Sequence, residues 1–173
     1  MLQREVIQKA EAFCRDNHVD SYPVPIVSLC QSKGISVFKD DLPDNVSGMI
    51  AIQHENYENY GTGRVIAINR NDSPSRQRFT IAHELAHYVL HKPEHDDLYA
   101  HRDVGQGGSI EQEANLFASC LLMPRALVLD ALQSLLQQSS GPLSRSDLVN
   151  HIAWQFLVSR AAADVRLRQL DLI

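Results

Sequence analysis

The segment His83-Glu84-Leu85-Ala86-His87 constrains this chain more than any other feature. A helix turns about 100° per residue, so His83 and His87 lie on one face and both imidazoles can bind one metal ion. Glu84 lies to the side of that face, where its carboxylate can accept a proton from a metal-bound water. The pentapeptide therefore predicts a zinc peptidase site, with the two histidines as metal ligands and Glu84 as the catalytic base.

The flanking residues predict that both histidines point into the protein. Apolar side chains at helical spacing share their face, namely Phe79, Ala82, Ala86 and Leu90. A core histidine satisfied by a backbone carbonyl is the alternative, and it suits a single histidine. Two histidines at this spacing with a glutamate between them would leave several buried polar groups to satisfy. A shared metal satisfies both rings at once.

A catalytic zinc ion has three protein ligands and one open position for water, so a third ligand is needed. The HExxHxxGxxH pattern of the metzincins would supply a third histidine from the same segment. This chain has Leu90 in place of the glycine and Pro93 in place of the histidine. The third ligand must therefore come from another segment.

The next predicted helix, which Pro124 closes, contains the best candidate. A capping box at Ser109 and Gln112 begins this helix. Glu113 shares a face with apolar residues farther along it, whereas Glu111 lies on a smaller and more polar strip. A buried, unpaired carboxylate is costly, so a cation near Glu113 is the economical explanation.

Two other interpretations of these carboxylates follow from the same physics. Glu113 could form an ion pair with Arg76 or Arg78 in place of binding a metal. Glu111 fits the first turn of a helix, where the dipole favours an acid, or the role of a partner to a ligand histidine.

Two blocks of this sequence together resemble the ImmA/IrrE family of metallo-endopeptidases. The first is RFTIAHELAHYVLH at 78–91, and the second is EANLFA at 113–118 with LLMP at 121–124. The resemblance extends upstream through 65–69 and downstream through 156–167, so it covers most of residues 45–170. It implies that His83, His87 and Glu113 bind Zn²⁺ and that Glu84 is the catalytic base.

The resemblance also implies a protein substrate. Members of the family typically act on helix-turn-helix transcriptional repressors, often encoded beside them on phages or other mobile elements, and thereby release an operon. A different class stays open, in which the chain is a non-catalytic antirepressor, or a binding protein of the toxin-antitoxin type, that sequesters a regulator through the same cleft.

Composition fits one zinc-peptidase domain over 1–173, because 173 residues with 44% hydrophobic content can bury one substantial core. The net charge of −5 and the scattered basic residues argue against strong nucleic-acid binding. The first ten residues lack the apolar core of a signal peptide, and no run approaches the roughly 20 apolar residues of a membrane span. We expect a cytoplasmic protein that does not bind membranes, and the sequence carries no signal for an oligomeric state.

The expected fold class is α+β, with a small three-stranded, mostly antiparallel sheet on a zincin-like helical core. Helices are predicted at 2–17 and 25–33 (N-terminal part, 1–34), and strands at 35–39, 46–53 and 64–69 (sheet, 35–70). The metal-site helices fall within 73–124. C-terminal helices (125–173) are predicted at 125–137, 146–155 and 159–170, the last two resembling a helix-turn-helix.

Strand 65–69 is the expected edge that receives the substrate, because it directly precedes the catalytic helix. An interior position for this strand is the alternative.

Three smaller expectations concern side chains around the site. The segment 95–108 joins the two metal-site helices as a rim or lid, and His95, Tyr99 or His101 could stabilise the oxyanion, although all three also suit a solvated loop. His91 is expected to cap helix carbonyls or orient a neighbour. Three cysteines without a C-x-x-C pair suggest buried, unpaired thiols at Cys14, Cys30 and Cys120.

Overall fold

The computed structural model describes residues 1–53, 63–91 and 108–173, which form seven helices and three strands. The α+β class expected from the sequence is confirmed. The elements are α1 (Gln3–Asp16), α2 (Ile26–Ser32), β1 (Ile35–Asp40), β2 (Gly48–Gln53), β3 (Gly63–Asn69), α3 (Pro74–His91), α4 (Ser109–Leu122), α5 (Arg125–Gln138), α6 (Arg145–Phe156) and α7 (Arg160–Gln169). Most boundaries lie within one or two residues of the predicted ones, because helical and strand periodicities are local properties of the sequence.

The sheet is mixed, with the strand order β1-β3-β2. β3 is antiparallel to β2, its neighbour in sequence, and parallel to β1. The parallel pairing arises because β3 inserts between two strands that run in opposite directions. The sequence predicted a mostly antiparallel sheet. The parallel pair could not be foreseen, because strand periodicity does not reveal the order of the strands in the sheet.

The expectation that 65–69 forms the receiving edge is wrong, because β3 is the central strand. Its last five residues, Val65 to Asn69, are all buried. Such an unbroken buried run is typical of a strand covered on both faces and flanked on both sides. Among the described residues β1 and β2 are the two edge strands of the sheet, and β2 is the one that packs against α3.

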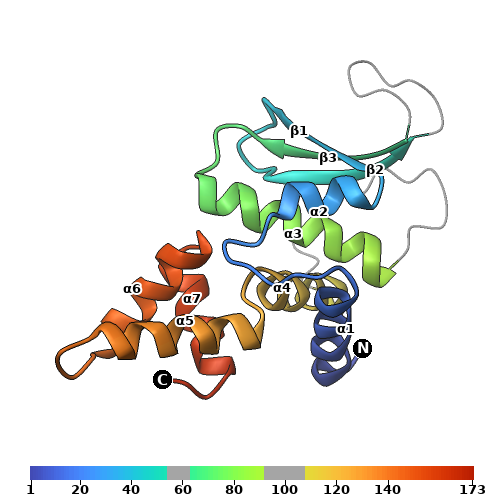
Figure 1. Cartoon of the computed structure of the whole chain (residues 1–173). Helices are drawn as coiled ribbons and strands as arrows, with labels where there is room; N and C mark the ends of the chain where they lie inside the picture. The colour runs from blue at the N-terminus through green and yellow to red at the C-terminus, as the bar shows by residue number, and fades with distance from the viewer. Residues whose placement is uncertain (54–62, 92–107) are drawn as a thin grey trace.

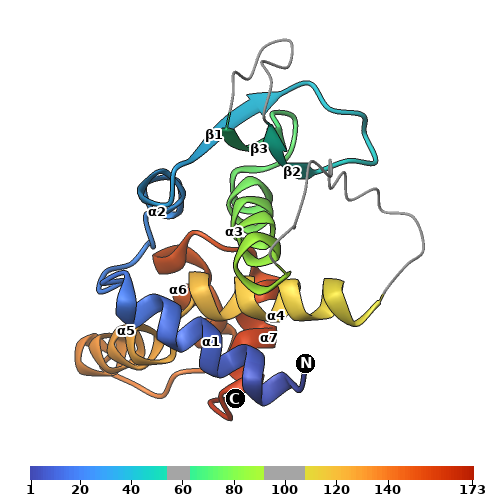
Figure 2. The same cartoon turned by 90° about the vertical axis from the view of Figure 1, so that its right-hand side faces the viewer.

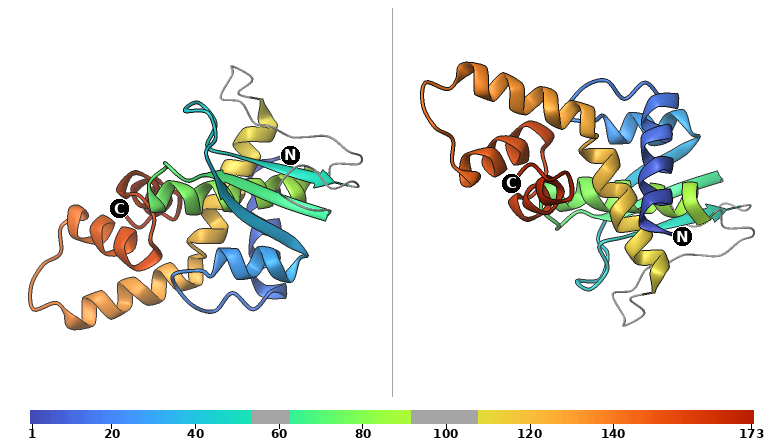
Figure 3. Two further views of the ribbon diagram at one scale, coloured as in Figure 1. Left: turned by 90° about the horizontal axis from the view of Figure 1, so that it is seen from above. Right: turned by 90° about the horizontal axis from the view of Figure 1, so that it is seen from below.

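The elements stack in layers from the sheet to the N-terminal helix (Figure 1). α2 packs against β1, and α3 packs against β2 and β3. α4 crosses the far side of α3, with α1 beside it, as a turned view makes clear (Figure 2). α5, α6 and α7 form a cluster at one end of the molecule, at a distance from the sheet (Figure 3).

The main core runs from the sheet through α3 and α4 to α1 on one side and to the C-terminal helices on the other. Phe117 of α4 is fully buried and contacts Phe13 of α1 edge to face, with ring centroids 5.7 Å apart. Cys14, Cys30 and Cys120 are buried and unpaired, which confirms the prediction from their spacing.

One predicted helix end differs in the structure, and another is as predicted. α4 begins after Gly108, which makes no side-chain cap, so the predicted capping box at Ser109 does not form. α2 is followed by Gly34 with φ +70°, a conformation that favours glycine and ends the helix where the sequence predicted. Within the described parts of the chain, no single helix has the length and apolar character to cross a membrane, although the bent pair α4 and α5 meets both criteria together.

Candidate metal centre

His83 and His87 lie one turn apart on α3 and turn their rings toward each other. The ring centroids are 4.6 Å apart, and the two Nε2 atoms are 3.0 Å apart. His87 is only 3% exposed. The spacing in the sequence therefore produces the predicted convergence of two imidazole nitrogens on one point.

The third donor at this point is Glu111, from the first turn of α4. Its carboxylate oxygens lie 3.2 Å from Nε2 of His83 and 3.5 Å from Nε2 of His87. One ligand atom from each of the three residues lies within 4.8 Å of the other two. Metal–ligand bonds of about 2.1 Å in a tetrahedral site would place neighbouring donors about 3.4 Å apart, so this donor set fits a divalent ion such as zinc.

Asn115, one turn after Glu111 on α4, contacts the Nδ1 side of the His83 ring. Its Oδ1 atom lies 3.0 Å from Nδ1 of His83. When Nε2 binds a metal, Nδ1 carries the proton and donates a hydrogen bond to this oxygen. The bond fixes both the tautomer and the orientation of the ring. Asn115 was not predicted to have a role in the site, although it lies in the EANLFA block that carries the family resemblance.

Glu113 contacts other residues than His83 and His87. Its carboxylate forms an ion pair with the N-terminal amine of Met1, and Oε2 lies 4.0 Å from Nε2 of His91. Glu113 is 8% exposed, so the prediction that it faces the interior is confirmed. However, the structure brings Glu111, and not Glu113, to His83 and His87. Neither Arg76 nor Arg78, the alternative partners, is paired with Glu113 among the described interactions.

Glu84 is 2% exposed and lies beside this cluster on α3. Burial raises the pKa of its carboxyl well above the usual value, the nearby Glu111 adds to the rise, and a hydrogen bond from the backbone amide of Ile50 opposes it. Within the described residues its Oε2 atom has no hydrogen-bond partner. A buried acceptor of this kind is costly unless something outside the chain, such as a water, occupies it.

His91 ends α3 and contacts the start of α4. Burial lowers the pKa of its ring, and the charge of Glu113 and the backbone of Ile110 oppose that shift. His91 is not among the three clustered donors of the described residues, and the expectation that it caps helix carbonyls or orients a neighbour stays a prediction. The other candidates near the site, His95, Tyr99 and His101, lie outside the described residues, as does nearly all of the segment expected to form a lid.

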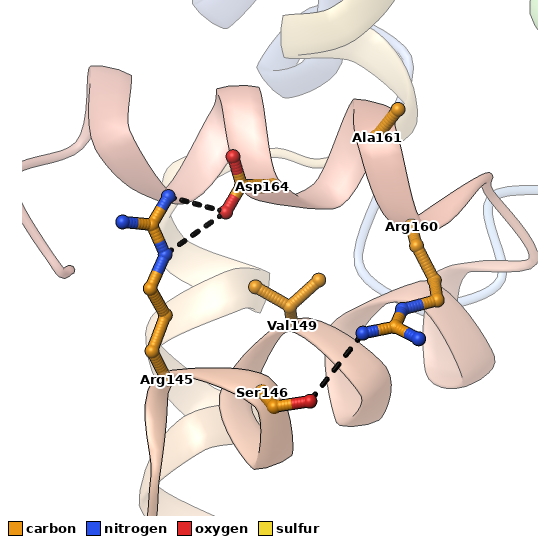
Figure 4. A pocket seen from close by; sticks show the side chains of 6 residues that line it. All are labelled: Arg145, Ser146, Val149, Arg160, Ala161 and Asp164. Atoms are coloured by element: carbon orange, nitrogen blue, oxygen red, sulfur yellow. Dashed lines mark hydrogen bonds and ion pairs between the residues drawn. The ribbon is translucent and has the colours of Figure 1, made fainter.

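A separate pocket of about 530 Å³ lies between the C-terminal helices α6 and α7. Figure 4 shows that Arg145 contacts Asp164 across its mouth and that Arg160 contacts Ser146. Arg168 also pairs with Asp164. α6, a short turn with Leu157 in the left-handed region, and α7 resemble a helix-turn-helix as expected, but these arginines are engaged within the pair of helices.

Comparison with protein families identifies the catalytic module. The model of the IrrE N-terminal-like domain, peptidase family M78, matches residues 30–168. The metallopeptidase ImmA of Bacillus subtilis is 28% identical over 145 residues, which are 84% of this chain and 76% of that protein. The radiation response metalloprotease IrrE of Deinococcus deserti is 42% identical over 73 residues, which are 39% of this chain and 25% of that protein.

The second IrrE protein and a solved structure extend the comparison. IrrE of Deinococcus radiodurans is 36% identical over 87 residues, which are 47% of this chain and 24% of that protein. A transcriptional regulator of Mycobacterium tuberculosis superimposes with a TM-score of 0.57 and 19% identity, covering 92% of this chain and 45% of that one. At that identity the superposition shows a shared fold. The chain thus spans about a quarter of the IrrE proteins and about half of this regulator.

Proposed function

Because the chain belongs to the metallopeptidase family defined by the IrrE N-terminal-like domain, we propose that it is a zinc-dependent, site-specific endopeptidase. One observation carries the proposal: two imidazoles and one carboxylate, on two different helices, converge beside the buried Glu84, one oxygen of which has no hydrogen-bond partner among the described residues. Burying such a set of polar groups costs free energy unless a cation and a water are bound. Peptide hydrolysis by a metallopeptidase requires both. The proposal includes one peptidase domain over 1–173.

We assign His83, His87 and Glu111 as the metal ligands, with Glu111 in the role predicted for Glu113. A bound zinc ion would supply a water of lowered pKa and would polarise the scissile carbonyl. Glu84 accepts the proton of that water and delivers it to the departing amine.

The outer edge of β2 is the surface that we assign to the substrate. The amide of Asn69 donates to the carbonyl of Ser47 at 2.8 Å, so Gly48 and Ile68 form a pair without mutual hydrogen bonds. Pairs alternate along an antiparallel ladder, so the backbone groups of Gly48 and Ile50 also turn away from β3. An extended peptide can add there as a further strand, with little demand on its sequence.

We propose that the substrate is a helix-turn-helix transcriptional repressor, whose cleavage releases its operon. The family resemblance supports this substrate class, and the net charge of −5 favours a basic partner. A cytoplasmic location is part of the proposal, because repressors work there.

The test is to incubate the chain with the product of the neighbouring gene, with and without a chelator. Fragments that appear only without chelator support the peptidase. A stable complex without fragments would overturn the proposal in favour of the sequestering protein. Digestion of casein does not decide between them, because a peptidase of narrow specificity leaves general substrates intact.

A further inference from the structure

The connection between the two edge strands crosses the end of the central strand. The last residues of β1 and β3, Asp40 and Asn69, pair with each other. β2 begins at the same end of the sheet, where Gly48 pairs with Ile68 on the other side of β3. Residues 42–47, here called the arch, therefore pass the end of β3 on their way to β2.

The side-chain amide of Asn69 bonds to this arch. Its Nδ2 atom lies 3.1 Å from the carbonyl oxygen of Leu42, 3.4 Å from that of Pro43 and 3.2 Å from that of Val46, so two hydrogens are shared among three acceptors. The backbone amide of Asn69 donates to the carbonyl of Ser47 at 2.8 Å. Asn69 is 4% exposed. Because unpaired buried carbonyls are costly, this one residue stabilises the arch along its whole length.

The helix that carries the paired histidines holds the same end of the sheet. Nε2 of Gln77 on α3 lies 3.0 to 3.2 Å from three carbonyl oxygens in the segment 69–72, which follows β3. Nε of Arg76, also on α3, donates to the hydroxyl of Ser47 at 2.8 Å. Ser47 directly precedes β2. α3 therefore contacts both the end of β3 and the start of β2.

The arch matters because β2 is the strand to which we assign the substrate. Among the described residues β2 pairs with β3 alone, so the ladder holds it from one side. A peptide that adds to its outer edge takes its register from the backbone of β2. If that edge is loosely held, binding must also order it, and affinity falls by the cost of ordering.

We propose that Asn69 is a positioning residue for substrate binding, because it holds the arch and thereby the start of β2. The bond between Arg76 and Ser47 supports the same arch from α3. Asn69 acts through β2 and not on the reacting atoms. Its role toward substrate rests on the proposed function, whereas its effect on β2 is tested without metal or substrate.

The first measurement is the ¹H–¹⁵N correlation spectrum of the metal-free protein, at a temperature where wild type and variant are both fully folded. Asn69→Ala is expected to shift the amide signals of the arch and of β2 as far as Ile52, about 13 Å along the strand from Gly48. Shifts confined to the residues that bond to Asn69, with the signals of β2 unmoved, would overturn the proposal.

The second measurement is cleavage of the repressor encoded by the neighbouring gene. Asn69→Ala should raise KM about tenfold, the equivalent of one or two hydrogen bonds. It should leave kcat within about twofold, because the bound substrate orders the edge, and zinc affinity should stay as in the wild type. A merely structural role would lower stability and leave KM unchanged in the folded protein. That result would overturn the proposal.

Arg70→Ala is the matched control. Arg70 follows Asn69 directly, but its Nη2 atom donates to the carbonyl of Lys39 on β1 at 3.1 Å, and its side chain is 52% exposed. The signals of β2 and KM should equal those of the wild type. Ser47→Ala keeps the test open if Asn69→Ala does not fold, since it removes only the contact with Arg76. It should raise KM about threefold, and unchanged KM together with unchanged signals of β2 would overturn the proposal.

The result is separable from the peptidase assignment. If the repressor is bound and not cut, its affinity takes the place of KM, and the peptidase assignment alone is lost. If the repressor is neither bound nor cut, the proposed function fails, whereas the spectra still decide whether Asn69 holds β2.

Discussion

The carboxylate of Glu111 lies 3.2 Å from Nε2 of His83, although the two residues belong to helices that are separated by 17 intervening residues of chain, 92–108. α3 supplies two imidazoles and the proposed base, and α4 supplies the acid that completes the donor set. The site therefore depends on how these two helices cross.

The identity of the third ligand is tested by comparing Glu111→Ala with Glu113→Ala. Glu111→Ala should weaken zinc binding by more than the roughly 10- to 100-fold that loss of a supporting partner costs. Glu113→Ala should stay within that range, because its carboxylate faces Met1 and His91. Competition with a zinc chelator measures both affinities. The reverse order of effects would return the ligand role to Glu113.

The role of Glu84 is tested by Glu84→Gln, which keeps the shape of the side chain and removes its basicity. Loss of a general base should lower turnover of a cleavable substrate by about 100- to 10,000-fold. Metal content, measured by mass spectrometry, should equal that of the wild type, because Glu84 is not among the three clustered donors. Normal turnover in this variant would refute the assignment of the base.

The burial of Glu84 predicts a pH dependence of stability in the metal-free protein. Its carboxyl pKa is raised on folding, chiefly by burial, above a reference value of 4.5. The folded state therefore binds more protons than the unfolded state, and the free energy of unfolding should fall as pH rises above about 4.5, by at most about 1.4 kcal/mol per pH unit. Glu84→Gln should remove this component of the slope.

Urea denaturation with a chelator present, at pH 5 and pH 8, measures this difference between the wild type and Glu84→Gln. Groups away from the site titrate equally in both proteins, so the variant is its own control for them. A wild-type protein that lost no more stability than the variant over this interval would contradict the burial of the charge.

The cysteines should be inert in the folded protein. Burial raises the pKa of Cys14 and of Cys30 to about 12, and it also raises that of Cys120. Only the thiolate reacts readily, so labelling by iodoacetamide at pH 8 should be slow in the native state and rapid in urea. Mass spectrometry counts the modified residues. Fast native labelling of any of the three would show that its helix opens frequently.

Much of this site could be predicted from residues that are close together in the sequence. The histidine pair, the base between them and the apolar stripe that turns them inward all follow from the period of one helix, and the structure shows the two rings converging as expected. The burial of Glu113 also followed from periodicity. Burial alone, however, does not say which neighbour a side chain meets.

Only the tertiary structure decided which glutamate meets the histidines and which strand lies at the edge. Helix periodicity fixes the face on which Glu111 or Glu113 lies, but the crossing of α4 over α3 selects the one that reaches His83. Likewise, the pattern of β3 fixes its strand character, whereas its central place depends on pairing with β1 and β2. Local sequence sets the conformation of each element, and contacts between distant elements set their order and register.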